Sequence, residues 1–348
     1  MNESIAIKIL VLSFVSFVAA IAITPALTHF LYRYRLSKSI RMSPDTPIYS
    51  RMHQKKEGTP TMGGILVWFT VLAIAVLFSV LANIFSSAQW ITKFDFLSRS
   101  ETYLPLGALI VAAIVGLVDD FFNIRKVGAV GGGLRIRHKL ILYILIAIFG
   151  AWWFYAKLEW TTLHVPFVGN FDIGIWYVPI FLFVIVATAF SVNEIDGLDG
   201  LSGGTLLAAF AAYGAIALIQ GKYDLAALCG VVIGALFAFL WFNINPARFF
   251  MGDTGSMSLG VTLGIIAMLT NAALLLPIIG FLFAVESASV LIQLVSKKVF
   301  KRKVFLSTPI HHHFEAKGWP EPKIVMRFWI ISAVTAVLGV ILAIIDIT

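Results

Sequence analysis

The stretch Leu106-Gly-Ala-Leu-Ile-Val-Ala-Ala-Ile-Val-Gly-Leu-Val-Asp119-Asp120 indicates the fold class of this chain. A run of apolar and small residues, typical of a membrane helix, ends in two adjacent carboxylates at the expected bilayer surface. Two carboxylates in a medium of low dielectric constant repel each other and resist desolvation, so a cation must lie near them. The negative end of a helix dipole disfavours acids, so capping does not explain the pair. Asp119 and Asp120 are therefore candidate functional residues, with a solvated helix end as the alternative.

The whole chain has the composition of an integral membrane protein. Of its 348 residues, 59% are hydrophobic and only 13% are charged, whereas a soluble domain carries about 25% charged residues. A hydrocarbon layer about 30 Å thick admits only helices or closed barrels, and long apolar runs without alternation indicate helices. The sequence therefore predicts an all-α polytopic membrane protein, with residues 1–348 forming one integral-membrane domain.

We expect about ten membrane-spanning helices. Their predicted bounds are 5–32, 62–84, 103–120, 138–156, 175–192, 203–219, 225–242, 257–270, 273–296 and 326–345. The first apolar run is too long for a signal-peptide core and no cleavage pattern follows it, so we expect it to be retained. An even number of spans places both termini on the same side of the membrane.

The basic residues predict the orientation of these spans. Of 26 Lys and Arg residues, 21 fall in the connections on one side, so that side is expected to be cytoplasmic and both termini external. The net charge of +8 then reflects loops that face anionic lipid headgroups, and we expect no nucleic-acid partner. The single Cys229, in an apolar run, excludes a disulfide framework and a cysteine metal site.

Two polar segments follow predicted spans on the cytoplasmic side. Residues 193–204 combine Asn193, Glu194, Asp196 and Asp199 with four glycines, which allow the backbone to approach a ligand closely. Residues 243–256 end in Gly-Asp-Thr-Gly-Ser, which resembles a cation or phosphate loop at the start of a helix. The alternatives are an ordinary polar loop and a serine cap with an aspartate in a turn.

Two further segments lie on the same side. Residues 308–315 contain three consecutive histidines, which could bind zinc, although successive residues of regular structure cannot all face one ion. Contact of one or two histidines with a phosphate or sugar fits better. Residues 56–64 resemble a glycine-rich turn into a helix, and here a plain loop-to-helix junction is the favoured interpretation.

Together these segments predict carboxylates, amides and histidines gathered at one cytoplasmic edge. Carboxylates and small loops suit Mg²⁺, with phosphate oxygens of a substrate completing its coordination. Mg²⁺ would neutralise the acid pair and orient an in-line attack on phosphorus. Because no GxxxxGK[ST] loop is present, an ATP-driven machine is disfavoured. The residues thus indicate phosphoryl or glycosyl-phosphoryl transfer at the membrane surface.

The chain resembles the polyprenyl-phosphate N-acetylhexosamine-1-phosphate transferases, and within them the muramoyl-pentapeptide branch. The matching pieces are Gly58-Thr-Pro-Thr-Met-Gly-Gly64, Gly116-Leu-Val-Asp-Asp120, Asp196-Gly-Leu-Asp-Gly-Leu201, Phe250-Met-Gly-Asp-Thr-Gly-Ser256 and Pro309-Ile-His-His-His-Phe-Glu315, with the run 317–332 after the last. They occur in the family's order over nearly the whole chain. The triple histidine with Lys-Gly-Trp-Pro-Glu-Pro is specific to that branch.

The resemblance implies a reaction and its setting. UDP-MurNAc-pentapeptide would donate phospho-MurNAc-pentapeptide to undecaprenyl phosphate, giving lipid I and UMP with Mg²⁺ as cofactor. The enzyme would be a multi-pass protein, and a homodimer, among the lipids of the bacterial cytoplasmic (inner) membrane.

The resemblance also implies roles for individual residues. Asp253 would be the Mg²⁺ ligand, and Asp119 and Asp120 would activate or position the lipid phosphate, with Asp119 a candidate base. The implied uracil pocket consists of Gly197, Leu198, Asp199, Asn243 and Phe250. The ribose and diphosphate region would be lined by Asn193, Asp196, Lys56 and Thr61. The remaining implied site residues are His312 and His313 as catalytic groups near the diphosphate-sugar, Gln293 and His311 as substrate contacts, and Ser256 near the metal loop.

The chain departs from the family's pattern at three places. Phe190 stands where the family usually has Asn, and Glu194-Ile195 fills a pair that is usually uncharged. Gly131-Gly-Gly133 precedes Leu134 where a basic residue is expected, with Arg135 or Arg137 as candidate substitutes. These changes bear on fine contacts to the nucleotide-sugar or the peptide.

Three other functions compete with this interpretation. A sister enzyme would transfer GlcNAc-1-phosphate to a polyprenyl phosphate, which the segment 309–323 disfavours. An ion-coupled transporter would use Asp119, Asp120 and Glu286 near mid-bilayer, whereas nearly all acids are predicted at one edge. An inactive scaffold is disfavoured by the intact set of acids. Direct attack and a covalent intermediate on an aspartate both remain open.

Overall fold

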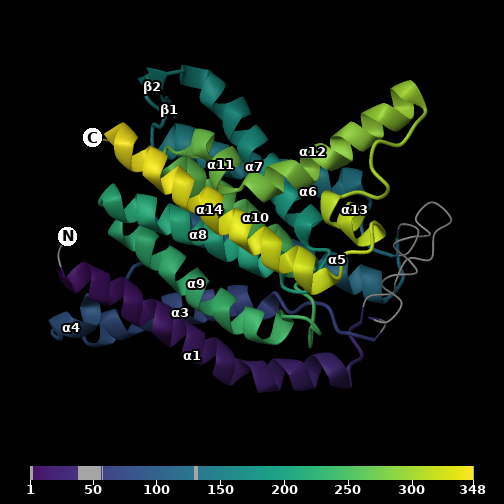
Figure 1. Cartoon of the computed structure of the whole chain (residues 1–348). Coiled ribbons are helices and arrows are strands. Elements are labelled where there is room, and N and C mark those ends of the chain that lie inside the picture. The colour runs from purple at the N-terminus through teal and green to yellow at the C-terminus, as the bar shows by residue number, and fades with distance from the viewer. Residues whose placement is uncertain (1–2, 38–55, 57, 129–131, 348) are drawn as a thin grey trace.

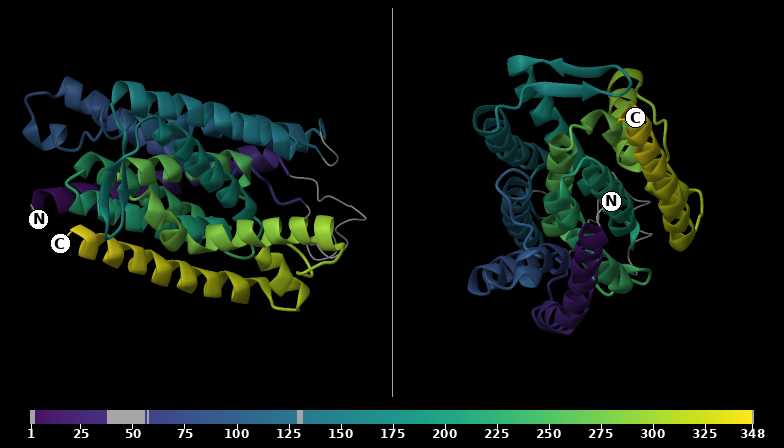
Figure 2. Two further views of the ribbon diagram at one scale, coloured as in Figure 1. Left: turned by 90° about the horizontal axis from the view of Figure 1, so that it is seen from above. Right: turned by 90° about the vertical axis from the view of Figure 1, so that its left-hand side faces the viewer.

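The computed structural model describes residues 3–37, 56, 58–128 and 132–347. These residues form an elongated helical bundle with both chain ends at the same end of the bundle, as Figures 1 and 2 show. In the part of the chain so described, nine helices are long and apolar enough to cross a membrane, or ten if one bent pair counts as a span. The prediction of an all-α polytopic membrane protein with about ten spans is confirmed. The side of the membrane that each end faces stays a prediction.

The long helices follow one another with short connections. They are α1 (Glu3–Arg33), α3 (Ile65–Ile84), α5 (Tyr103–Ile124), α6 (Ile136–Trp152, extended by a π-helical turn to Lys157), α7 (Tyr177–Ile195), α8 (Leu201–Ile219), α9 (Tyr223–Asn243), α10 (Gly252–Leu269) and α14 (Glu321–Ile347). The shorter elements are α4 (Gln89–Thr92), the antiparallel strands β1 (Thr162–Val165) and β2 (Gly169–Asp172), α11 (Leu276–Ile279), α12 (Phe281–Val295, extended by a π-helical turn to Phe300) and α13 (Ile310–Ala316).

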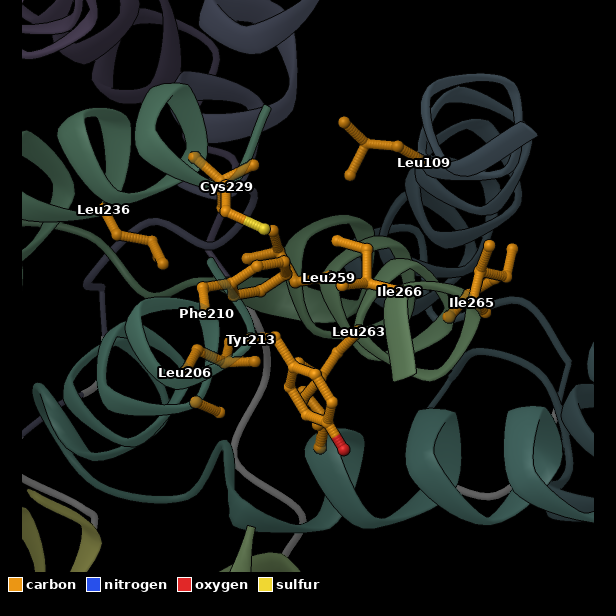
Figure 3. Close-up of a cluster of buried hydrophobic side chains, with 14 of the residues drawn as sticks. Leu109, Leu206, Phe210, Tyr213, Cys229, Leu236, Leu259, Leu263, Ile265 and Ile266 are labelled. Atoms are coloured by element: carbon orange, nitrogen blue, oxygen red, sulfur yellow. The ribbon is translucent and has the colours of Figure 1, made fainter. Parts of the chain in front are cut away.

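Helix α10 is the centre of the bundle, since every one of its residues is buried. Figure 3 shows its side chains Leu259 and Leu263 beside Phe210 and Tyr213. Helices α3 and α5 approach its first turn very closely: a Cβ atom on Gly64 would lie 2.3 Å from Gly255 Cα. In a membrane such close packing of small residues holds helices together. The first turn of α10, which carries Asp253, is therefore clamped between two neighbouring helices.

The span expected over residues 273–296 is not continuous. The chain breaks at Gly280, where the backbone angles (φ −98°, ψ 39°) are not helical, and the two segments meet at 83°. Glycine weakens a helix because it is conformationally free and has no side chain to pack, so the break falls there. Beyond the break α12 leaves the bundle (Figure 1), and Leu291 and Leu294 on it are exposed.

Two other boundaries change how the acids are placed. Helix α5 continues to Ile124 instead of ending at Asp120, so the acid pair lies within the helix and not at its end. Helix α10 begins at Gly252 instead of 257, so Asp253 belongs to its first turn. The predicted end of α5 was too early and the predicted start of α10 was too late. Both predictions relied on apolar side chains, and these helices continue into polar ones. The basic residues within 38–55 and the departure at Gly131 lie outside the described residues.

Candidate active site

Lys139 joins two of the predicted site acids. From the first turn of α6, its Nζ lies 2.6 Å from Asp119 Oδ2 on α5 and 2.9 Å from Asp253 Oδ1 on α10. The backbone N–H of Leu134 donates to the other oxygen of Asp119 at 2.5 Å. Both carboxylates are buried, with residue exposures of 1% and 5%. Helices distant in sequence thus bring two acids within reach of a single cation.

Sequence reasoning missed Lys139 as a site residue, because it counted only as one basic residue of a cytoplasmic loop. One feature of the sequence could have indicated it: Lys139 lies at the start of a predicted span, and the preceding predicted span ends in two acids. Which acid a lysine meets depends on how helices pack, and the sequence alone does not carry that information.

Asp120 is held at the start of α10. Its Oδ2 accepts the backbone N–H of Thr254 at 3.0 Å, and the Thr61 hydroxyl lies 3.5 Å from its Oδ1. A helix N-terminus carries unpaired N–H groups and a positive dipole end, so a carboxylate is stabilised there. Asp120 therefore ties α5 to α10 and sets the position of the neighbouring Asp119. Its expected contact with the lipid phosphate stays a prediction.

Asn193 joins the same group from the end of α7. Its side-chain Nδ2 donates to Asp253 Oδ1 at 2.6 Å and to Ser256 Oγ at 2.9 Å. Asp253 thus accepts from an amide and a lysine at one oxygen. The structure brings together six predicted residues and Lys139, a set that we call the carboxylate cluster: Thr61, Asp119, Asp120, Lys139, Asn193, Asp253 and Ser256.

Lys56 forms a second network with two acids. Its Nζ lies 2.6 Å from Asp199 Oδ1 and 2.5 Å from Glu321 Oε1, in the first turn of α14. Asn245 Nδ2 donates to the other oxygen of Asp199 at 2.9 Å. Burial lowers the pKa of Lys56, but the charges of Glu321 and Asp199 outweigh it and raise that pKa above its ordinary value. Lys56 therefore stays an ammonium group at neutral pH.

Glu321 is a second residue that the site prediction missed. It counted only as an acid of the cytoplasmic face, although it lies within the motif run 317–332. Its carboxylate also accepts the backbone N–H of Asp199 at 2.6 Å. Glu321 thus fastens the turn between α7 and α8 to the start of α14.

The residues expected to form a uracil pocket lie around this second network. Asn243 Oδ1 accepts the N–H of Gly200 at 2.9 Å, and its Nδ2 donates to the carbonyl of Phe249 at 2.8 Å. Lys56 Nζ lies 5.7 Å from the centre of the Phe250 ring, in a cation–π contact. Asn243 therefore joins the backbone at Gly200 to the backbone at Phe249. Direct contact of these residues with a base stays a prediction.

Asp196, Gly197 and Leu198 complete the turn that leads into α8. Asp196 accepts the hydroxyl of Ser202 at 2.7 Å, and Leu198 is buried. A Cβ atom on Gly197 would lie 2.3 Å from His311 Nε2, so only glycine fits against this histidine. The turn is thereby connected to the histidine segment.

The three histidines on α13 have three different partners, as helical geometry requires. His311 Nδ1 lies 3.0 Å from Glu286 Oε1, and both side chains are fully buried. His312 Nδ1 lies 2.6 Å from Glu315 Oε2, and His313 Nδ1 accepts the N–H of Leu306. Successive residues of a helix point about 100° apart. They do not converge on one metal ion.

His311 is surrounded by carboxylates. Burial lowers its pKa, but the charges of Glu286, Glu315 and Glu194 outweigh burial and raise it above the ordinary value. Glu194 is one of the departures from the family's pattern. The departure therefore places an additional carboxylate near a histidine of the site.

Both the oxygen and the nitrogen of the Gln293 side-chain amide form hydrogen bonds with a nearby loop. Its Oε1 accepts the N–H groups of Val304 and Phe305, both at 3.0 Å, and its Nε2 donates to the carbonyl of Phe305. Gln293 therefore holds residues 304–305 against α12. Its expected contact with the sugar stays a prediction.

The carboxylate cluster fits a magnesium ion that is completed by a substrate. Among the described residues, no three His, Cys, Asp or Glu side chains are grouped so as to hold a metal by themselves. Mg²⁺ does not need such a cage, because it commonly binds one or two carboxylates together with phosphates and water. Lys139 contacts both Asp119 and Asp253, so their oxygens already lie near one cation. The hard oxygen donors suit Mg²⁺.

Two family models match segments of this chain that contain residues of the candidate site. Residues 56–66 match the phospho-N-acetylmuramoyl-pentapeptide-transferase signature 1, and residues 103–271 match the model of glycosyl transferase family 4. A phospho-N-acetylmuramoyl-pentapeptide-transferase of Geobacillus thermodenitrificans is 40% identical over 94% of this chain and 95% of its own length. The chain belongs to the phospho-N-acetylmuramoyl-pentapeptide-transferase family.

Other members of the family are similar over the same extent. The transferase of Chloroflexus aggregans is 36% identical over 97% of this chain and 90% of its own length. That of Anoxybacillus flavithermus is 37% identical over 98% of each chain. The resemblance drawn from the motifs is confirmed, and the family matches include Lys56, Thr61 and the acids of the carboxylate cluster.

Proposed function

We propose that this chain transfers phospho-MurNAc-pentapeptide from UDP-MurNAc-pentapeptide to undecaprenyl phosphate, forming lipid I and UMP in peptidoglycan synthesis with Mg²⁺ as cofactor. The observation that carries the proposal is the meeting of Asp119 and Asp253 at Lys139, on the end of the bundle away from both termini. Membership of the family supplies the substrates. The excess of Lys and Arg in the loops at this end supports a cytoplasmic position for it, where the nucleotide-sugar would be available.

The carboxylate cluster has the groups that phosphoryl transfer requires. When bound, Mg²⁺ would offset the charge of the diphosphate, with Asp253 as its protein ligand and Asp119 nearby. Lys139 would bind and orient the phosphate of the lipid acceptor as a fixed cation. Asn193 would hold Asp253 in place, and Asp120 would position Asp119. The chain's main task is alignment and charge compensation, because a phosphate monoester oxygen is already a fair nucleophile.

The contacts of Asp119 favour a direct attack over a covalent intermediate. One of its oxygens accepts the N–H of Leu134, and the other contacts Lys139. A carboxylate engaged at both oxygens is a poor nucleophile toward phosphorus. It can still take a proton from the acceptor phosphate or hold that phosphate against Lys139. We therefore assign Asp119 to proton transfer and positioning.

The Lys56 network and the histidine segment would bind the donor. Lys56, charged and in contact with Phe250, is suited to a diphosphate close to a planar base. The turn 196–199 lies between that network and His311. The nucleotide would lie along this turn, with the sugar toward α13.

Two of the three competing functions predict properties that differ from those of the proposed enzyme. A GlcNAc-1-phosphate transferase would not need the segment 309–323. A transporter would need acids near mid-bilayer, whereas Glu286, in the bent candidate span, pairs with His311 of α13, which lies outside the candidate spans. Both observations favour the muramoyl-pentapeptide transferase.

Purified protein in nanodiscs tests the proposal directly. UDP-MurNAc-pentapeptide and UDP-GlcNAc are each supplied with undecaprenyl phosphate, with Mg²⁺ or with EDTA. We expect UMP release and a lipid product only with the muramoyl nucleotide and only with Mg²⁺. Turnover of UDP-GlcNAc alone would contradict the assignment, and undiminished turnover in EDTA would contradict the cofactor.

A further inference from the structure

An apolar cleft of about 560 Å³ lies between α5 and α6. Its floor includes Ile265 of the central helix α10, which is only 1% exposed, whereas Val111 and Phe149 on its rim are half-exposed. The cleft is therefore closed toward the protein and open toward the lipid. A Cβ atom on Gly107 would meet nothing within 4 Å, so the missing side chain there keeps the cleft open.

The cleft leads along both helices to the carboxylate cluster. On α5, Val115 lines it and lies four residues before Asp119, on the same face of the helix. On α6, Leu142 and Ile146 line it and lie three and seven residues after Lys139. One stripe on each helix thus passes from a charged residue of the site into the cleft. At 1.5 Å per residue, Tyr103 at the far end of the cleft lies about 24 Å from Asp119.

We propose that the cleft between α5 and α6 binds the prenyl chain of the lipid acceptor, with the acceptor's phosphate at Lys139. The proposal rests on the proposed function, because that function supplies an acceptor with an anionic head and a long apolar tail. Charge and shape both fit such a molecule: a buried cation stands at one end, and an apolar wall follows it. A bulk phospholipid matches the apolar wall, but its phosphodiester carries about one negative charge where a phosphate monoester carries about two, so it gains less from Lys139.

Filling the cleft tests the proposal by kinetics. Gly107→Phe places a ring in the cleft, and Ile114→Phe, on the half-exposed face of the same helix outside the cleft, is the control. We expect Gly107→Phe to raise KM for undecaprenyl phosphate about tenfold. KM for UDP-MurNAc-pentapeptide and for geranyl phosphate, which is too short to reach Gly107, should not change. Equal effects on both acceptors, no effect, or the same effect in the control would overturn the proposal.

A second measurement does not depend on turnover or on a variant that folds. Wild-type protein in nanodiscs is labelled with an undecaprenyl phosphate analogue that carries a diazirine on the fourth isoprene unit from its phosphate. We expect cross-links within residues 103–111 and 145–153 that undecaprenyl phosphate suppresses and phosphatidylglycerol does not. Labelling elsewhere, or equal suppression by phosphatidylglycerol, would contradict the proposal. Labelling of the cleft without any transferase activity would contradict only the proposed function.

Discussion

The two ends of the helical bundle use ion pairs in different ways. At the end that carries the candidate site, each of two lysines contacts two carboxylates: Lys139 with Asp119 and Asp253, and Lys56 with Asp199 and Glu321. This end also has two one-to-one pairs, which His311 and His312 form with Glu286 and Glu315. At the end that carries the termini, the described ion pairs contain one acid for each base: Lys8 with Asp224, and His164 with Asp346.

This difference separates structural ion pairs from a binding site. The pairs near the termini join distant segments: Lys8 connects α1 with α9, and Asp346 connects α14 with the hairpin that contains His164. In a one-to-one pair, the charge of the base balances the charge of the acid. Two buried carboxylates on one lysine repel each other, and a further cation relieves that repulsion. The site end is therefore suited to bind Mg²⁺ with a phosphate, and the other end is suited to hold helices together.

The largest effect is expected where the shared acids are removed. Asp253→Ala and Asp119→Asn should each lower turnover by at least about 100-fold, the scale of losing a key electrostatic or proton-transfer group. The measurement is UMP release at saturating substrates, with thermal unfolding as a check on folding. Near-normal turnover in either variant would refute the role given to that residue.

A smaller effect is expected when the shared cation is removed. Lys139→Gln should lower turnover about tenfold, since the acceptor phosphate loses a fixed cation. The same change leaves Asp119 and Asp253 without their lysine, so the Mg²⁺ concentration that gives half-maximal activity should fall. Lys139→Arg, which keeps the charge, should shift that concentration less. An unchanged or higher Mg²⁺ requirement in Lys139→Gln would show that Lys139 does not compete with the metal.

The histidine segment gives a pH-dependent prediction. The pKa of His311 is raised in the folded protein, because Glu286, Glu315 and Glu194 outweigh burial. Its imidazolium therefore adds stability that is complete below about pH 6.5 and is lost as pH rises through the folded-state pKa. We expect the Tm of the wild type to fall above about pH 6.5 by on the order of 2 °C more than that of Glu286→Gln. Parallel pH profiles of the two proteins would exclude this linkage.

The smallest effect is expected at the end with the termini. Lys8→Met removes one partly exposed ion pair and should cost about 0–1 kcal/mol of stability. Because this end has no part in the proposed chemistry, turnover should stay at the wild-type level. A tenfold loss of turnover without loss of folded protein would show that the end with the termini also takes part in the reaction.

The fold class and most of the site acids were predictable from the sequence. Apolar runs identify the spans because the bilayer requires long uncharged helices, and acids near such runs, among them Asp119, Asp199 and Asp253, are conspicuous. Motif order then brought these acids into one expected site. These signals are local, so a single sequence carries them.

The partners of those acids were not predictable in the same way. In the sequence, Lys139 and Glu321 look like any other charged loop residues. Helix packing brings Lys139 to Asp119 and Asp253, and Glu321 to Lys56 and the N–H of Asp199. The break at Gly280 was also missed, because the apolar run continues through it. The helix ends near Asp120 and Asp253 depend on close contacts between helices, and a hydropathy profile contains no information on such contacts.

Direct binding of a divalent ion tests whether the carboxylates that share Lys139 form the metal site. Mn²⁺ replaces Mg²⁺ and is followed by its electron paramagnetic resonance signal in protein without substrate and with UDP-MurNAc-pentapeptide. Asp253→Asn should weaken Mn²⁺ binding at least about tenfold, whereas the matched Asp224→Asn at the other end should bind like the wild type. Wild-type affinity in Asp253→Asn, or an equal loss in Asp224→Asn, would show that Asp253 is not the metal ligand.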